Sequence, residues 1–295
     1  MNEAGNTQIS MAASDSHSVD TLGVIAGRGQ YPRVLIESAR AQGVQRIVAI
    51  AFRKETDPHI NRLADEVHWI RLGQLQPLLD ALQRSNVKTV VMAGQLKPTH
   101  LFTVRVDAAM RRLLGGLKER NAHTIFGAVG AELQKCGITL QEASLFMEST
   151  MPEAGQFAGE APDESEAADM KLGLHVAKTT SQLDIGQTVV IKEGTILAVE
   201  AFEGTDKTIL RAGQVGGKGG VVVKVAKQGH DMRFDIPVIG ERTIRMCRKA
   251  GIALLAVEAK RTILLDRDAV ISAANKAELK LVAVEFTRSV GPLEL

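Results

Sequence analysis

The chain has 295 residues with 36 basic and 34 acidic side chains, so its net charge of +2 gives no bulk signal for nucleic-acid binding. Aromatic residues make up only 3%, and the two cysteines, Cys136 and Cys247, lack the spacing of a disulfide framework or a zinc site. No apolar run approaches the roughly 20 residues of a membrane span. We therefore expect a cytoplasmic protein of two domains with no nucleic-acid partner.

Residues 1–20 are polar and rich in small side chains, which predicts a disordered tail that is not a signal peptide. From residue 21 to 148, apolar runs alternate with amphipathic segments. Strands are predicted at 22–26, 46–52, 67–72 and 87–93, and helices at 32–43, 75–82, 106–114 and 122–134. This alternation indicates a parallel sheet covered on both faces, so the N-terminal domain should be Rossmann-like α/β.

Residues 149–166 are rich in Pro, Gly, Glu and Ala, and we predict an interdomain linker that buries no apolar surface. Residues 167–295 should form a second, mixed α/β domain, which we expect to be catalytic. Its predicted strands are 188–192, 195–199, 221–225, 253–258, 262–265 and 279–285, and its predicted helices are 165–183, one around Ile244 and one around Val270.

Glycine-rich turns follow two strands of the first domain. Gly27 and Gly29 lack the third glycine of a dinucleotide fingerprint, and no acid is placed to hold a ribose hydroxyl. We interpret them as positions where the backbone approaches a ligand phosphate. Lys97 follows the fourth predicted strand and could meet a phosphate there, although an exposed loop lysine is the alternative. Residues 215–220 are interpreted as a flexible glycine-rich loop.

Carboxylates gather where a strand of the second domain ends. Glu200, Glu203 and Asp206 follow the run 195–199 at three-residue intervals, and Asp235 stands directly before an Ile-Pro corner. Acidic groups on backbone fixed by Gly and Pro suit a divalent cation that faces an anionic substrate. The alternatives are a solvated surface loop and, for Asp235, the cap of a helix beginning near Gly240.

Five blocks of sequence carry a family resemblance when they are taken in order. They are GVIAGxGxxP at 23–32, GxxKP at 94–98, LDIGQ at 183–187, LAVEAFEGTD at 197–206 and RxDxPxxG at 233–240. In this order the chain resembles the I-type UDP-2,3-diacylglucosamine pyrophosphatase family of lipid A biosynthesis.

The resemblance implies hydrolysis of the diphosphate of UDP-2,3-diacylglucosamine to UMP and 2,3-diacylglucosamine 1-phosphate, with Mg²⁺ as cofactor. It also implies transient contact with the inner-membrane surface, and a homodimer is a further expectation. The site residues that we assign are Asp235, Glu200 and Glu203 as catalytic, Asp235 and Asp206 as metal ligands, and Gly27, Gly29, Lys97, Thr205, Lys224 and Arg233 as substrate-binding.

Two other functions remain open from the residues alone. One is a nucleotide-sugar-binding transferase with a Rossmann-like domain. The other is a non-catalytic carrier of a lipid-linked nucleotide, in which the carboxylates only bind ribose or solvent. Magnesium-dependent release of UMP without an acceptor would separate hydrolysis from both.

Overall fold

The sheet of the first domain has five parallel strands in the order β3-β2-β1-β4-β5. The computed structural model describes residues 19–96, 104–227 and 231–286, so the predicted tail lies almost wholly outside it. The strands are β1 (Thr21–Ala26), β2 (Arg46–Phe52), β3 (Glu66–Ile70), β4 (Thr89–Ala93) and β5 (Thr139–Leu140). The Rossmann-like topology is confirmed, and β5 is an addition too short for a periodic pattern to reveal.

Helices cover both faces of this sheet. Successive residues of a strand point to opposite faces, and apolar residues on both faces need a helix to cover them. Leu22, Val24 and Ala26 pack under α1 (Tyr31–Ala41), whereas Ile25 packs with α2 (Leu75–Arg84) and α5 (Ala122–Lys135). The smaller helix α4 (Ala108–Gly115) lies against α2 and α5, and short 3-10 turns occur at Pro58–Arg62 and Glu148–Thr150.

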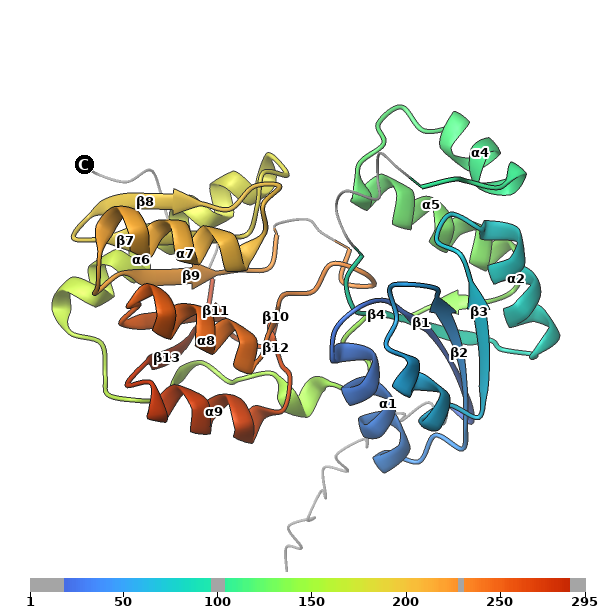
Figure 1. Cartoon of the computed structure of the whole chain (residues 1–295), viewed down its shortest axis with the longest axis horizontal. Helices are drawn as coiled ribbons and strands as arrows, with labels where there is room; N and C mark the ends of the chain where they lie inside the picture. Colours follow the sequence, from blue (N-terminus) through green and yellow to red (C-terminus); the bar gives the residue numbers. More distant parts are fainter. Residues whose placement is uncertain (1–18, 97–103, 228–230, 287–295) are drawn as a thin grey trace, which may run out of the picture.

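The second domain contains a six-stranded sheet in the order β6-β13-β11-β9-β7-β8. Strands β9 (Val221–Lys224), β11 (Leu254–Glu258) and β13 (Lys280–Val284) are parallel, while β7 (Thr188–Lys192) runs antiparallel to both β9 and β8 (Thr195–Val199). Helix α6 (Glu164–Gln182) covers one face. Helices α7 (Thr205–Gly216), α8 (Glu241–Ala250) and α9 (Arg267–Lys276) cover the other, so the predicted mixed α/β class is confirmed (Figure 1).

The segment predicted as a featureless linker contains a strand. Strand β6 (Gly155–Ala158) pairs antiparallel with β13, and Ala158 is buried in the core of the second domain. The expectation that residues 149–166 bury no apolar surface is therefore wrong. The pairing of β6 with β13 joins segments more than a hundred residues apart, so no local sequence pattern could predict it.

Helix α7 is also absent from the sequence prediction. Gly204, with φ of +82°, ends the preceding turn and is the N-cap, so Thr205 and Asp206 form the first turn of a helix. Ile209 and Ala212 are fully buried on its inner face. The Glu-Gly-Thr-Asp run is thus a strand-to-helix junction. Of the residues 215–220 predicted as a flexible loop, 215 and 216 belong to the helix, and only 217–220 follow its end.

A part of the second half of the chain completes the core of the first domain. Strands β10 (Val238–Ile239) and β12 (Ile263–Leu264) pair in parallel, and Ile263 is fully buried in the core formed under α1. Just before β10, the ring of Phe234 packs at 5.7 Å from that of Phe126 and 5.6 Å from that of His123, both on α5. The stretch that carries Asp235 is therefore anchored on the N-terminal domain.

The two cysteines differ sharply in exposure, which gives a prediction. Cys247 is fully buried on α8, and burial, together with the negative charge of Asp206, raises the pKa of its thiol to about 12. Cys136 is partly exposed. Since the thiolate is the reactive form, we expect a thiol reagent such as DTNB to titrate one cysteine in the folded protein and two in denaturant. Rapid native labelling of Cys247 would contradict this packing.

Candidate active site

Three of the sequence blocks meet at one edge of the six-stranded sheet. Thr188 of β7 lies opposite Lys224 of β9, and the backbone N–H of Glu200, just past β8, donates to Thr188 O at 2.8 Å. Figure 1 shows β8 and β9 pointing toward the N-terminal domain. This is the carboxyl edge of the parallel strands, where open α/β sheets bind their ligands.

Buried Glu200 and Lys224 form a polar cluster with the partly buried Thr205 at this edge. The Thr205 hydroxyl donates to Glu200 Oε1 at 2.9 Å and accepts from Lys224 Nζ at 2.9 Å. Glu200 and Lys224 are only 8% and 5% exposed, and within the described residues Glu200 Oε2 has no hydrogen-bond partner. A buried carboxylate oxygen without a partner is costly unless a ligand, ion or water satisfies it.

Gly186 of the LDIGQ block fixes the position of Glu200. A Cβ at Gly186 would lie 2.1 Å from the carbonyl oxygen of Glu200, so only glycine allows this approach of the two backbones. The LDIGQ and AVEAFEGTD blocks are therefore in direct contact.

Asp235 belongs to an ion-pair group centred on Lys227. Lys227 Nζ lies 2.6 Å from Asp184 Oδ1 and 3.4 Å from Asp235 Oδ2. Burial acts to lower the pKa of Lys227, but the hydrogen bond to Asp184 and the charge of Asp235 outweigh it and raise that pKa. Lys227 thus links the LDIGQ and RxDxPxxG blocks. It was missed in the sequence, although the rule that selected Lys97, a basic residue just beyond a strand, applies equally to it.

Two of the predicted carboxylates form ion pairs away from this group. Glu203 Oε1 lies 2.7 Å from Arg211 Nη2, and the hydrogen bond from Arg211 is the main reason that the pKa of Glu203 is lowered. Asp206 Oδ2 lies 2.6 Å from Nε of the largely exposed Arg242. Both residues sit at the start of α7, where negative charge is favourable. Their assigned catalytic and metal-binding roles remain predictions.

Arg233 forms an ion pair with the nearby Asp231. Its guanidinium contacts the carboxylate of Asp231, with Nε at 2.8 Å from Oδ1, and the hydrogen bond from Arg233 lowers the pKa of Asp231. Arg233 also lies beside Gly130 of α5. Its assignment as a substrate-binding residue stays a prediction.

The glycine turns of the first domain pack against each other. A Cβ at Gly27 would lie 2.7 Å from the carbonyl oxygen of Gln95, and one at Gly94 would lie 2.6 Å from that of Arg28. This close approach of two backbones accounts for Gly27 without a ligand. Gly29 has φ of +88° and open space where a Cβ would be. Lys97 lies outside the described residues.

A preformed metal cage is not present in the part of the chain that the structure describes: it holds no group of three or more His, Cys, Asp or Glu side chains arranged to bind an ion. Mg²⁺, however, keeps several waters and commonly uses one or two carboxylates together with substrate phosphates. The spare oxygen of Glu200 and the carboxylate of Asp235 fit that mode in donor chemistry.

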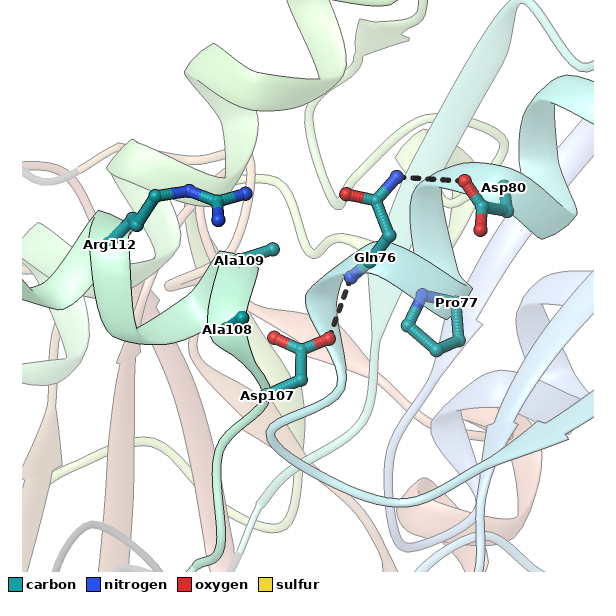
Figure 2. Close-up of a pocket in the computed structure, with 7 residues that line it drawn as sticks. All are labelled: Gln76, Pro77, Asp80, Asp107, Ala108, Ala109 and Arg112. Atoms are coloured by element: carbon teal, nitrogen blue, oxygen red, sulfur yellow. Dashed lines mark hydrogen bonds between the residues drawn. The ribbon is translucent and has the colours of Figure 1, made fainter.

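Two shallow pockets lie elsewhere on the surface. One is bounded by Arg245, Met246, Arg248 and Lys249 on α8. The other lies between α2 and α4, where Asp107 accepts a hydrogen bond from Gln76 N and Gln76 donates to Asp80 (Figure 2). Gln76 thus joins Asp80 and Asp107 of this second pocket, and none of the assigned site residues that the structure describes borders either pocket.

Comparison with family models decides the relationship of the chain. The LpxI N-terminal domain model matches residues 21–150, and the LpxI C-terminal domain model matches residues 153–282. The chain belongs to the LpxI family. The UDP-2,3-diacylglucosamine pyrophosphatase LpxI of Caulobacter vibrioides is 31% identical over 278 residues, which cover 90% of this chain and 97% of the relative. The resemblance predicted from the sequence blocks is confirmed.

Solved structures with some likeness include biotin carboxylases. The ADP-bound biotin carboxylase domain of a thermophilic 2-oxoglutarate carboxylase is 12% identical with a TM-score of 0.27, covering 58% of this chain and 34% of that one. The biotin carboxylase subunit of pyruvate carboxylase is 15% identical with the same TM-score, covering 67% of this chain and 41% of that one. At such scores the likeness carries no argument about this LpxI chain.

Proposed function

We propose that this LpxI family member hydrolyses the diphosphate of UDP-2,3-diacylglucosamine to UMP and 2,3-diacylglucosamine 1-phosphate. The observation that carries the proposal is the meeting of blocks 183–187, 197–206 and 233–240 at one sheet edge, in a chain related over most of its length to a named pyrophosphatase. Cleavage of a diphosphate needs charge neutralisation and a positioned water more than a covalent intermediate. A buried carboxylate, a second carboxylate and two lysines are suited to that chemistry.

In the proposed reaction, the oxygen of a water forms a bond to one phosphorus and the bond from that phosphorus to the bridging oxygen breaks. Asp235 orients the water and takes up its proton. Lys224 binds a phosphate oxygen through its remaining N–H groups. The Thr205 hydroxyl donates to Glu200 and accepts from Lys224, both at 2.9 Å, and so fixes the position of that ammonium. Lys227 holds Asp235 and is held in turn by Asp184.

The charge of the edge favours a cation in this reaction. Among the described residues of the two polar groups, three carboxylates, those of Asp184, Glu200 and Asp235, face two ammonium groups, those of Lys224 and Lys227, which leaves one net negative charge. A cation would reduce the repulsion between this charge and a diphosphate. We propose that Mg²⁺ held by Asp235 and Glu200 supplies this neutralisation, with Asp206 as a further predicted ligand.

The test is release of UMP from UDP-2,3-diacylglucosamine without an acceptor. We expect release with Mg²⁺, loss of release with excess EDTA and recovery when Mg²⁺ is restored. Release only with an added acceptor would favour the transferase, and binding without release would favour the carrier. The cytoplasmic location, contact with the membrane surface and a homodimer remain predictions; within residues 19–96, 104–227 and 231–286 no helix is long and apolar enough to cross a bilayer.

Lys97 gives a prediction for the first domain. If it meets a substrate phosphate, Lys97→Ala should weaken nucleotide binding by about 1.5–3 kcal/mol, the range for a hydrogen bond to a charged group. Lys88→Ala is the matched control, because exposed Lys88 directly precedes β4 at the opposite edge of the sheet. Calorimetric titration with UMP compares the affinities of the two variants, and equal affinities would remove Lys97 from the site.

The phosphate interpretation of Gly27 and Gly29 has a separate test. Recovery of stoichiometric NAD or FAD from the purified protein would overturn it.

A further inference from the structure

A buried ion pair lies beside the proposed site, on the α6 face of the sheet. Lys178 Nζ of α6 is 2.6 Å from Glu258 Oε2 at the end of β11, and the two side chains are only 6% and 5% exposed. The ammonium also lies 4.7 Å from the centre of the Phe286 ring. Neither residue belongs to the sequence blocks or to the group assigned to the chemistry.

The pair holds a single backbone position from both sides. Glu258 Oε2 accepts from the N–H of Ala226 at 2.8 Å, and Lys178 Nζ donates to the carbonyl oxygen of Ala226 at 2.9 Å. The ladder of β9 ends just before this point, where Val225 N still donates to Gln187 O at 3.0 Å. The backbone of Ala226, just beyond the β9 ladder, therefore bonds to two charged side chains and not to a neighbouring strand.

Stability alone does not explain such a pair. Removing two charges from water costs much of what their attraction returns, and well-packed apolar residues in the same place are often as stable. Apolar residues, however, could not donate to a carbonyl and accept from an N–H. What the charged pair adds is a fixed direction of the chain at Ala226.

That direction matters because the next residue is Lys227. Lys227 Nζ reaches Asp184 at 2.6 Å and Asp235 at 3.4 Å. We propose that Lys178 and Glu258 are positioning residues: they fix Ala226 so that Lys227 holds Asp235 where the reaction needs it. The inference rests on the proposed function for the role of Asp235, and on the structure for the contacts at Ala226.

The test removes the two hydrogen bonds by removing both buried charges together. Arg261, whose Nε lies 3.7 Å from Glu258 Oε1, loses this ion pair, but its side chain is 43% exposed and keeps contact with water. In Lys178→Met/Glu258→Leu both bonds to Ala226 are lost. In Lys178→Met/Glu258→Gln the amide oxygen can still accept from Ala226 N–H. We expect kcat to fall about tenfold or more in the first variant and less in the second, with KM nearly unchanged, because small displacements of a reacting group cost rate more than binding.

A matched control uses another ion pair of α6. Lys280 Nζ lies 2.6 Å from Glu166 Oε2 at the opposite end of the helix, and both side chains are largely buried. Lys280→Met/Glu166→Leu should lower the melting temperature but keep the wild-type kcat. An equal fall of kcat in this control would assign the effect to general loosening and overturn the proposal.

Hydrogen exchange supplies a readout that does not depend on activity. The amides of Ala226 and Lys227 should exchange faster in Lys178→Met/Glu258→Leu than in the wild type and the control. Wild-type exchange together with wild-type kcat would overturn the positioning role. If the wild type does not cleave the substrate, the proposed function fails, while exchange still tests the contacts at Ala226. If the Met/Leu variant does not fold, the Met/Gln variant, which loses only the bond to the Ala226 carbonyl oxygen, is compared with the control instead, and a wild-type kcat in it would overturn the positioning role.

Discussion

Asp235→Ala is expected to lower kcat by about 10²–10⁴-fold, the range for losing a positioned acid–base group. The reason is that Asp235, held by Lys227 at the sheet edge, acts on the attacking water in the transition state. Substrate should still bind through its nucleotide and acyl parts. The free energy of unfolding should change by no more than about 1 kcal/mol, since the ion pair is partly exposed and Lys227 keeps Asp184.

The alternative that Asp235 only caps the following helix is wrong. Helix α8 begins at Glu241, and its N-cap is Gly240, without a side-chain hydrogen bond. Glu153→Ala is a suitable control, because it breaks an exposed ion pair with Lys260 and should leave turnover intact. Steady-state kinetics beside a thermal melt separates rate from folding, and near-native turnover of Asp235→Ala at saturating Mg²⁺ would remove Asp235 from the chemistry.

Gly186→Ala is expected to damage both stability and turnover. Its Cβ would press on the backbone of Glu200, which cannot move aside as the tip of a flexible side chain can. Overpacking of this kind costs about 1–3 kcal/mol and occasionally more. Because the strain falls on Glu200, kcat should fall as well.

Gly127→Ala is the matched control for that substitution. Gly127 lies inside α5, and nothing is within 4 Å of where its Cβ would be, so alanine should be neutral or stabilise the helix by up to about 1 kcal/mol. Urea denaturation of both variants gives the comparison. Equal midpoints for Gly186→Ala and the wild type would mean that the LDIGQ block does not touch Glu200.

Local patterns predicted those parts of the fold that are regular over several residues. Strands β2, β7 and β8 have the predicted bounds, because each is an apolar run closed by turn residues. Helix α7 was missed because Gly213 and the glycines at its end weaken the helical pattern. The spacing of Ile209 and Ala212 was the signal that could have found it. Strand β6 depends on a distant partner, β13, and could not be predicted locally.

The sequence blocks indicated which segments form the site, but not which side chains pair with one another there. Their spacing along the chain predicts that Glu200, Glu203 and Asp206 act together. In the structure, Glu203 instead pairs with Arg211 of α7, and Asp206 pairs with Arg242 of α8. The pairing of Lys227 with Asp184 and Asp235 becomes apparent only when the start of β7 lies beside the end of β9. Side-chain pairing across strands is set by sheet register, which the local sequence does not contain.

The bond that is broken can be observed directly by ³¹P NMR of the wild-type protein with UDP-2,3-diacylglucosamine and Mg²⁺. We predict that the paired diphosphate resonances disappear and are replaced by two phosphomonoester resonances of equal intensity, those of UMP and 2,3-diacylglucosamine 1-phosphate. An unchanged diphosphate, or UDP formed with its diphosphate intact, would contradict the account.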